Sequence, residues 1–457
     1  MSHQASLNSP AFFAGKIGLI LVVMLLCAAP IVRAQDAIRP SLAGEASAEA
    51  RRISVEQIPY NLQLGPMKVR FSATLGFEYN DNVNLAEDGS LLVPTFGGGA
   101  TLVTTEQQSD FIIRPQVNLN LLWPITQLNT FRLDLGVGYA FYMDHSDYNS
   151  NAILLNPGSQ LAFDIFVGDF RINIHDRFSL EQDPVAELSL SNVADYGRFQ
   201  NTAGVSVLWD LNAAVVTVGY DHYNFISMTD TFDYLDRNAE MFTGSVAFTP
   251  NSVMSVGVEG ALVDTYYDQN FMNDSMGYAA GLFLETQITT NLKLRVAGGY
   301  QNIDFDNNGL LIDPQDVSDY YANFMLSHRV NSTLTHSLSA GHENQLGVNS
   351  NFITLNYVRH TANWNILYHT LLSTELFYED AQDSGGSILF VPGPGAPLFN
   401  PFAAEHIHRF GGALSLGYQL TPHVTVGFRY QFTKKDSDLP LRDYTQNRVS
   451  VDGTYSF

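Results

Sequence analysis

The sequence has almost no cysteine, and this lack excludes several kinds of chemistry. Cys27 is the only cysteine in 457 residues, and it lies in an apolar run, 17–29, between Lys16 and Ala34. Such a run predicts a cleaved signal peptide over 1–34, because about 13 apolar residues are too few for a spanning helix, which needs about 20. Removal of this leader would leave no thiol for a disulfide, a thiolate metal site or a cysteine nucleophile.

Charge is also scarce, and basic residues are scarcest. Only 15% of residues are charged, with 23 Lys and Arg against 46 Asp and Glu, whereas soluble proteins average about 25% charged residues. The net charge of -23 and the lack of a segregated basic face exclude nucleic acid as a partner, because its phosphates would be repelled. Outside the run 17–29, no other stretch approaches the length and apolar character of a spanning helix.

What the chain does have is a regular alternation of apolar and polar residues from 67 to 457. Period two predicts β-strands with one apolar and one polar face. Two segments, 237–249 and 351–366, alternate poorly. The clearest examples are 69–79, 131–141, 170–175 and 424–432.

Short and long links alternate between these strands. The short links hold the Pro, Asn, Asp, Thr and Gly that tight turns require; they lie at 124–129, 168–169, 211–212, 249–252, 289–291, 331–333, 368–370 and 421–423. The long links are rich in Asp and Asn; they cover 82–107, 144–157, 183–197, 226–236, 265–275, 304–317, 344–350, 381–404 and 434–443. Together they predict about 18 strands, with 16 and 20 as alternatives.

These features predict an all-β fold, a closed antiparallel transmembrane β-barrel over 67–457, preceded by a short periplasmic segment or small plug over 35–66. The sheet must close, because an open edge in hydrocarbon leaves backbone groups unpaired. Trp123 and Trp209 beside short turns, and Phe77 near a long link, predict two aromatic girdles. A propeller is disfavoured because each of its repeats needs four strands, and only two are found here.

Both ends of the barrel carry residues that resemble a known family. The first strand runs into 79–83 (Tyr-Asn-Asp-Asn-Val), and the last contains 447–449 (Asn-Arg-Val) and ends at 455–457 (Tyr-Ser-Phe). These segments resemble the beta-barrel porin 2 group of bacterial outer-membrane proteins. The resemblance implies the outer membrane of a diderm bacterium as location, its lipid and barrel-insertion machinery as partners, no catalytic residue and, for some relatives, a link with extracellular polysaccharide export.

The polar face of such a barrel faces the lumen, because Lys or Arg on the lipid face would cost about 2–4 kcal/mol at the midplane. The rest of this inner wall is expected to be Ser, Thr, Asn and Gly. Its charges either pair across strands or form an Arg/acid constriction whose field orients a polar or anionic solute. The pore-lining candidates are Arg70, Arg114, Arg132, Arg171, Arg177, Arg295, Arg429, Arg448, Glu78, Asp134, Glu181 and Glu285.

No metal site or cofactor is predicted, although two motifs come close. Asp304, Asp306 and Asn308 begin like a calcium loop, but Gln315 stands where a bidentate Glu belongs. The pair 406 and 408 places two imidazoles on one strand face without a visible third ligand. Divalent cations are expected only in a general way, where acidic loops meet anionic headgroups.

The leading interpretation is a porin-like channel for passive diffusion or export of hydrophilic solutes, because about 18 strands can enclose an aqueous pore. The alternative is a non-conducting anchor or adhesin barrel whose surface loops are functional; the link 381–404 could fold inward or reach outward in either case. An enzyme is not expected, because no histidine stands in a recognisable hydrolase motif. The solute and the oligomeric state are not predicted.

Overall fold

The structure is a computed structural model that describes residues 60–96, 98–388 and 400–457. The predicted signal peptide, most of the segment 35–66 and the middle of the link 381–404 lie outside these residues. The described helices are three short 3-10 turns, η2 (Ser146–Tyr148), η3 (Pro184–Ala186) and η4 (Asp230–Leu235). No helix in the described part of the chain is long and apolar enough to cross a bilayer.

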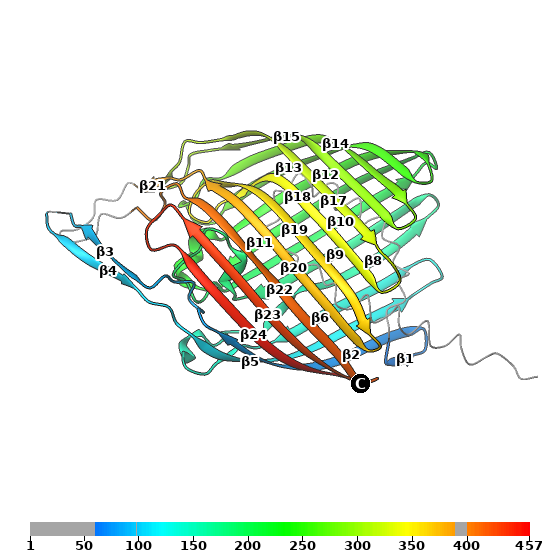
Figure 1. The fold of residues 1–457 in the computed structure, drawn as a ribbon. Coiled ribbons are helices and arrows are strands. Elements are labelled where there is room, and N and C mark those ends of the chain that lie inside the picture. Colours follow the sequence, from blue (N-terminus) through cyan, green and yellow to red (C-terminus); the bar gives the residue numbers. More distant parts are fainter. Residues whose placement is uncertain (1–59, 97, 389–399) are drawn as a thin grey trace, which may run out of the picture.

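One antiparallel sheet curls round and closes on itself (Figure 1). The first long strand, β2, pairs with β5 on one side and with the last strand, β24, on the other. The wall has 18 strands, because β7 continues β6 and β1 is a three-residue strand that pairs only with the start of β2. The predicted closed barrel of 18 strands is therefore confirmed.

The wall strands follow one another in chain order around the barrel. Their bounds are β2 (Met67–Asn80), β5 (Asp110–Pro124), β6 (Thr130–Gly138) with β7 (Phe141–Tyr142), β8 (Leu154–Val167), β9 (Phe170–Glu181), β10 (Arg198–Asp210), β11 (Ala214–Ser227), β12 (Arg237–Asn251), β13 (Met254–Tyr267), β14 (Ser275–Thr289), β15 (Leu292–Phe305), β17 (Val317–Arg329), β18 (Leu334–Leu346), β19 (Phe352–Leu367), β20 (Thr370–Asp383), β22 (His406–Thr421), β23 (Val424–Ser437) and β24 (Tyr444–Ser456).

The remaining strands are short and lie at the ends of the wall. They are β1 (Leu62–Leu64), β3 (Gly89–Pro94), β4 (Ala100–Thr105), β16 (Leu311–Ile312) and β21 (Ser387–Ile388). β3 and β4 pair only with each other, and this hairpin projects away from the long-link end (Figure 1). β16 pairs with β21, which joins two long links.

Short turns and long links occupy opposite ends of the barrel, as predicted. β8 and β9 are joined by two residues, and the first of them, Gly168, has a φ of +57° that glycine adopts without strain. Asn212 has a φ of +65° in the turn between β10 and β11. The turn residues recognised in the sequence therefore mark every reversal at this end of the barrel.

Side chains alternate between the two faces of the wall. In β2, Phe77 is 52% exposed on the outer face, whereas its neighbour Glu78 is 9% exposed on the inner face. Trp123 and Trp209, beside short turns, are also exposed outside, as are Tyr220 and Tyr300 near long links. The outer face is thus an apolar band between two aromatic girdles, as in transmembrane barrels.

The inner face differs from the sequence-based expectation at its long-link end. A large apolar cluster lies at this end of the interior, and inward side chains of strand ends pack there against links. The expectation of a wall made only of Ser, Thr, Asn, Gly and charges is wrong for this part. The cluster consists of Leu190, Tyr196, Tyr223, Phe225, Phe232, Leu235, Ala239, Met241, Val263, Tyr267, Met272, Ile303, Phe305, Leu311, Val317, Leu346, Val348 and Phe402.

Candidate functional site: the lumen and its inward link

The link 183–197, between β9 and β10, folds into the lumen instead of extending outward; we call it the inward link. Near its start, the carbonyl oxygen of Val185 accepts a hydrogen bond from Arg409 Nη1 on β22 at 2.6 Å. Further along, Ser189 Oγ donates to Asp383 Oδ1 on β20 at 3.1 Å. Since β20 and β22 lie several strands from β9 and β10 in either direction, the link must cross the barrel interior to reach them.

Apolar contacts hold the inward link at both ends of its crossing. Leu188 is buried against inward side chains of β19, β20 and β22, among them Leu355 and Ile407. Tyr196 is fully buried in the apolar cluster, where its ring meets Phe232 edge-on at 4.8 Å. Burial of large side chains on this scale stabilises a structure by about 1.5–3 kcal/mol each, so the link has a defined position.

A buried ionic group holds the far side of the inward link. Lys435 Nζ donates to Ser191 Oγ at 3.1 Å and lies 2.9 Å from Glu405 Oε1. Glu405 also pairs with Arg442 at 2.5 Å, and the side chains of Lys435 and Glu405 are fully buried. Removal of one member of such a group leaves an uncompensated buried charge, so this contact fixes the link against the wall.

The start of the inward link completes a charge network on the wall. Asp183 Oδ2 lies 2.5 Å from Arg448 Nη1, and Arg448 Nη2 lies 2.9 Å from Glu78 Oε1. Arg114 reaches the same Glu78 oxygen at 3.3 Å. Burial raises the pKa of Asp183, but the guanidinium groups of Arg448 and Arg114 lower it further, so its pKa lies below its usual range. Asp183 is therefore a carboxylate at neutral pH.

Three predicted pore-lining residues, Glu78, Arg114 and Arg448, thus meet at one place. Asp183 was not among the candidates, because the sequence places it in a long link whose composition does not differ from that of the outward links. Its partner Arg448 is 265 positions away.

The other predicted pore-lining residues lie in separate patches around the wall. Arg295 lies 3.0 Å from Glu259 and 3.7 Å from Glu285. Arg171 pairs with Asp164 at 3.0 Å, and Glu181 lies 3.6 Å from Arg198. Cross-strand pairing therefore accounts for many of the wall charges, as one of the two interpretations predicted.

The remaining candidates do not belong to the ion pairs described above. Two of them bond to neutral side chains. Asp134 accepts hydrogen bonds from Asn120 at 2.8 Å and Gln160 at 3.0 Å. Arg429 Nη2 donates to Gln431 Oε1 at 3.4 Å, so this bond is to an amide oxygen and not to a carboxylate. The residues that lie opposite one another across strands here are Arg70 and Asn120, Arg132 and Ala162, and Arg177 and Gln160.

The weak calcium candidates do not converge on one point. Asp304 lies within β15 and accepts a hydrogen bond from Asn302 at 2.8 Å. The side chain of Asn308 is hydrogen-bonded to Asp274 through both of its polar atoms. The backbone N–H of Asp306 donates to the carbonyl oxygen of Asp274. These bonds stabilise neighbouring links and leave no shared set of oxygen ligands among the three candidates.

The strand pairing defines the class of protein, a closed barrel of the transmembrane type. The chain is similar to solved structures from Pseudomonas aeruginosa. They include OccK2 (OpdF) in complex with glucuronate, at 10% identity over 85% of this chain and 98% of that chain with a TM-score of 0.44. OpdQ is 9% identical over 86% of this chain and 98% of that chain with a TM-score of 0.46.

Comparisons of the sequence itself give no relative. No family model matches the chain. No curated protein matches it either. The resemblance to the beta-barrel porin 2 group therefore stays a prediction based on the residues at the two ends of the barrel.

Proposed function

We propose that this chain is an outer-membrane channel for small hydrophilic solutes, narrowed by the inward link. The observation that carries this proposal is the crossing of the lumen by 183–197, anchored through Asp183 to Arg448 and through Val185 to Arg409. A segment that enters a closed barrel and carries an acid to face arginines forms a constriction with both signs of charge. Such a constriction selects solutes by size and by the orientation of their dipoles.

Partial exposure of the wall charges supports contact with water in the lumen. The side chains of Arg114 and Asp183 keep 32% and 35% of their surface accessible, although both belong to the network around Arg448. Glu285 on β14 is more open still. Charged groups with this exposure remain hydrated, and they can attract or repel an ion that passes.

The outer face supports placement in the outer membrane of a diderm bacterium. Its apolar band and two aromatic girdles fit the hydrocarbon layer and its two interfaces, and the signal peptide predicted from the sequence would provide export. The link with extracellular polysaccharide rests only on the family resemblance, and none of the described contacts adds support to it.

The proposal is tested by conductance. Purified protein, shown to be folded by a gel mobility that changes on boiling, is added to planar lipid bilayers. We expect discrete stepwise currents and, in liposome-swelling measurements, uptake of small sugars and organic acids that falls with solute size. Folded protein that inserts into the bilayer without conducting would overturn the proposal and favour the non-conducting anchor.

A further inference from the structure

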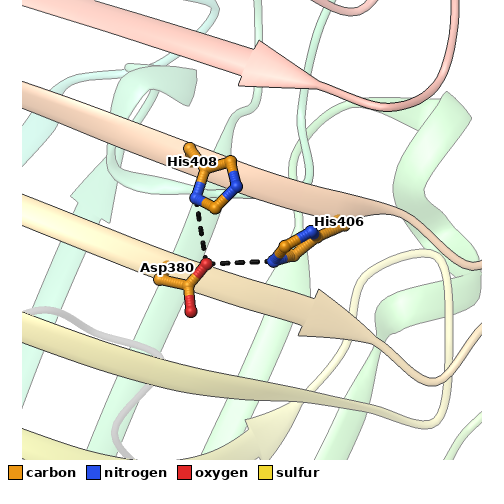
Figure 2. Close-up of side chains that lie close together, drawn as sticks. All are labelled: Asp380, His406 and His408. Atoms are coloured by element: carbon orange, nitrogen blue, oxygen red, sulfur yellow. Dashed lines mark hydrogen bonds and ion pairs between the residues drawn. The ribbon is translucent and has the colours of Figure 1, made fainter.

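Two histidines and one aspartate converge on the outer surface of the barrel, near its long-link end. His406 and His408 lie on β22, and Asp380 lies on the neighbouring strand β20, directly opposite His408. Figure 2 shows both imidazoles aimed at one carboxylate oxygen: Asp380 Oδ1 lies 2.9 Å from His406 Nε2 and 3.0 Å from His408 Nδ1. Ile407, between the two histidines, is fully buried inside the barrel, so the strand itself holds both imidazoles on the outer face.

The arrangement has the donor set and the spacing of a transition-metal site. Two imidazole nitrogens and a carboxylate oxygen are common ligands of Zn²⁺, and atoms about 2.1 Å from a tetrahedral ion lie about 3.4 Å from one another. The ligand atoms of the three residues all lie within 4.8 Å of one another, and the two nitrogen–oxygen distances are already slightly shorter than that spacing. Small rotations of the side chains would therefore admit an ion.

The surroundings leave one side of the group open. Tyr378 Oη lies 3.3 Å from His408 Nδ1. On β23, Asp436 lies opposite His408 but is paired with Lys434 at 2.8 Å. On β19, the residue opposite Asp380 is the neutral Asn356. The three side chains are 33–45% exposed, so water or another ligand can reach a fourth coordination position.

Other histidines near the long-link end show what an ordinary ion pair looks like in this barrel. His222 pairs with Glu240 at 2.9 Å, and His342 pairs with Asp319 at 2.9 Å. Each of these pairs has a single imidazole, and neither belongs to a group of three candidate ligands in the described residues. Within the described ranges, Asp380 is the only carboxylate that pairs with two imidazoles. A simple ion pair does not require this arrangement, whereas a metal site does.

We propose that Asp380, His406 and His408 form a binding site for a divalent transition-metal ion of the Zn²⁺ type on the outer rim of the barrel. The site does not depend on conduction, because it lies on the opposite face of the wall from the lumen. Hard cations such as Mg²⁺ and Ca²⁺ should bind poorly at this site, because they prefer oxygen donors and two of the three ligand atoms are nitrogens. Its affinity falls with falling pH, because protons compete with the metal ion for the ligand atoms.

The test is an isothermal calorimetric titration, in which Zn²⁺ is added to the EDTA-treated, detergent-solubilised protein. We expect one ion per chain, not displaced by excess Mg²⁺ or Ca²⁺, with affinity that weakens between pH 7.5 and pH 5.5. His406→Gln, His408→Gln and Asp380→Asn should each weaken binding by about tenfold or more. His222→Gln is the matched control, because it removes an imidazole from a single-histidine pair, and it should leave binding unchanged.

A gel mobility that changes on boiling confirms that each variant is folded. Because the substituted side chains are exposed, their replacement should not prevent folding. Absence of Zn²⁺ binding by the unaltered protein overturns the proposal. Binding that survives in the His406→Gln/His408→Gln double variant also overturns it, as does equal loss in His222→Gln, because either result places the ion elsewhere.

Discussion

The two ends of the same lumen are built differently. At the short-turn end, the inner wall carries residues such as Arg171, Ser206 and Arg295, whereas the long-link end holds the apolar cluster and is crossed by the inward link. Between the two aromatic girdles the outer face shows no such contrast, since lipid requires apolar side chains along this whole band. Lipid therefore dictates the outer face of the membrane-spanning part of each strand, while the inner face is free to hold water at one end and a packed core at the other.

The strongest test of this contrast is to remove the inward link. Replacement of 184–195 by a short Gly-Ser linker should raise single-channel conductance by at least about twofold, because the segment that crosses the lumen is gone. The matched control removes the projecting β3–β4 hairpin, 89–105, which pairs only with itself. Equal conductance before and after removal of 184–195 would show that the link does not limit the current.

The apolar cluster should carry much of the stability of the long-link end. Phe225 is 1% exposed there and lies beneath the Arg237 guanidinium at 4.4 Å. Phe225→Ala should lower the free energy of unfolding by about 3–5 kcal/mol through the cavity it leaves, measured by guanidinium titration in detergent. Phe242→Ala is the control, because Phe242 is 51% exposed on the outer face, where detergent or lipid fills the vacated space. A similar loss in both variants would contradict a packed interior.

A smaller loss is expected where the inward link meets the polar wall. Arg448→Met would leave Glu78 and Asp183 without their shared partner. Removal of one partner from a buried ion pair costs about 3–5 kcal/mol, and partial exposure of Asp183 reduces this to about 2–3 kcal/mol. The same unfolding titration measures it, and increased open-channel noise should accompany it.

Lys434→Met provides the comparison for Arg448→Met. Lys434 pairs with Asp436 on the outer rim, and both side chains are about two-fifths exposed, so its loss should leave the free energy of unfolding almost unchanged. If Arg448→Met were equally mild, Asp183 would not anchor the link.

The sequence was sufficient to predict the wall because each strand is constrained locally. Lipid outside and turn residues such as Gly168 leave few alternatives for strand and turn positions. The segments 237–249 and 351–366, which alternate poorly, are the strands β12 and β19, and the structure gives the reason. Met241 and Leu355 face inward near the long-link end and belong to apolar clusters, so both faces are apolar there. Weak alternation was the sequence signal of the packed interior.

The course of the inward link could not be predicted in the same way. Its residues, such as Asp183 and Asn192, are those of any surface link, and its destination depends on partners far along the chain, including Arg409 and Lys435. The third ligand of the proposed metal site could not be predicted from the sequence for the same reason. Asp380 is 26 residues from His406, and only the pairing of β20 with β22 brings them together.

The smallest expected effect concerns the wall charges themselves. Arg429 donates to an amide oxygen, and Arg429→Gln should move the reversal potential in a salt gradient towards cation preference, because one positive charge is lost from the lumen while the wall acids remain. The double variant Arg171→Gln/Asp164→Asn removes a pair already balanced at 3.0 Å and should leave the potential unchanged. A shift in the double variant as large as that of Arg429→Gln, or none in either, would mean that the net charge of this wall does not set ion preference. The polar end of the lumen would then differ from the apolar end in hydration alone.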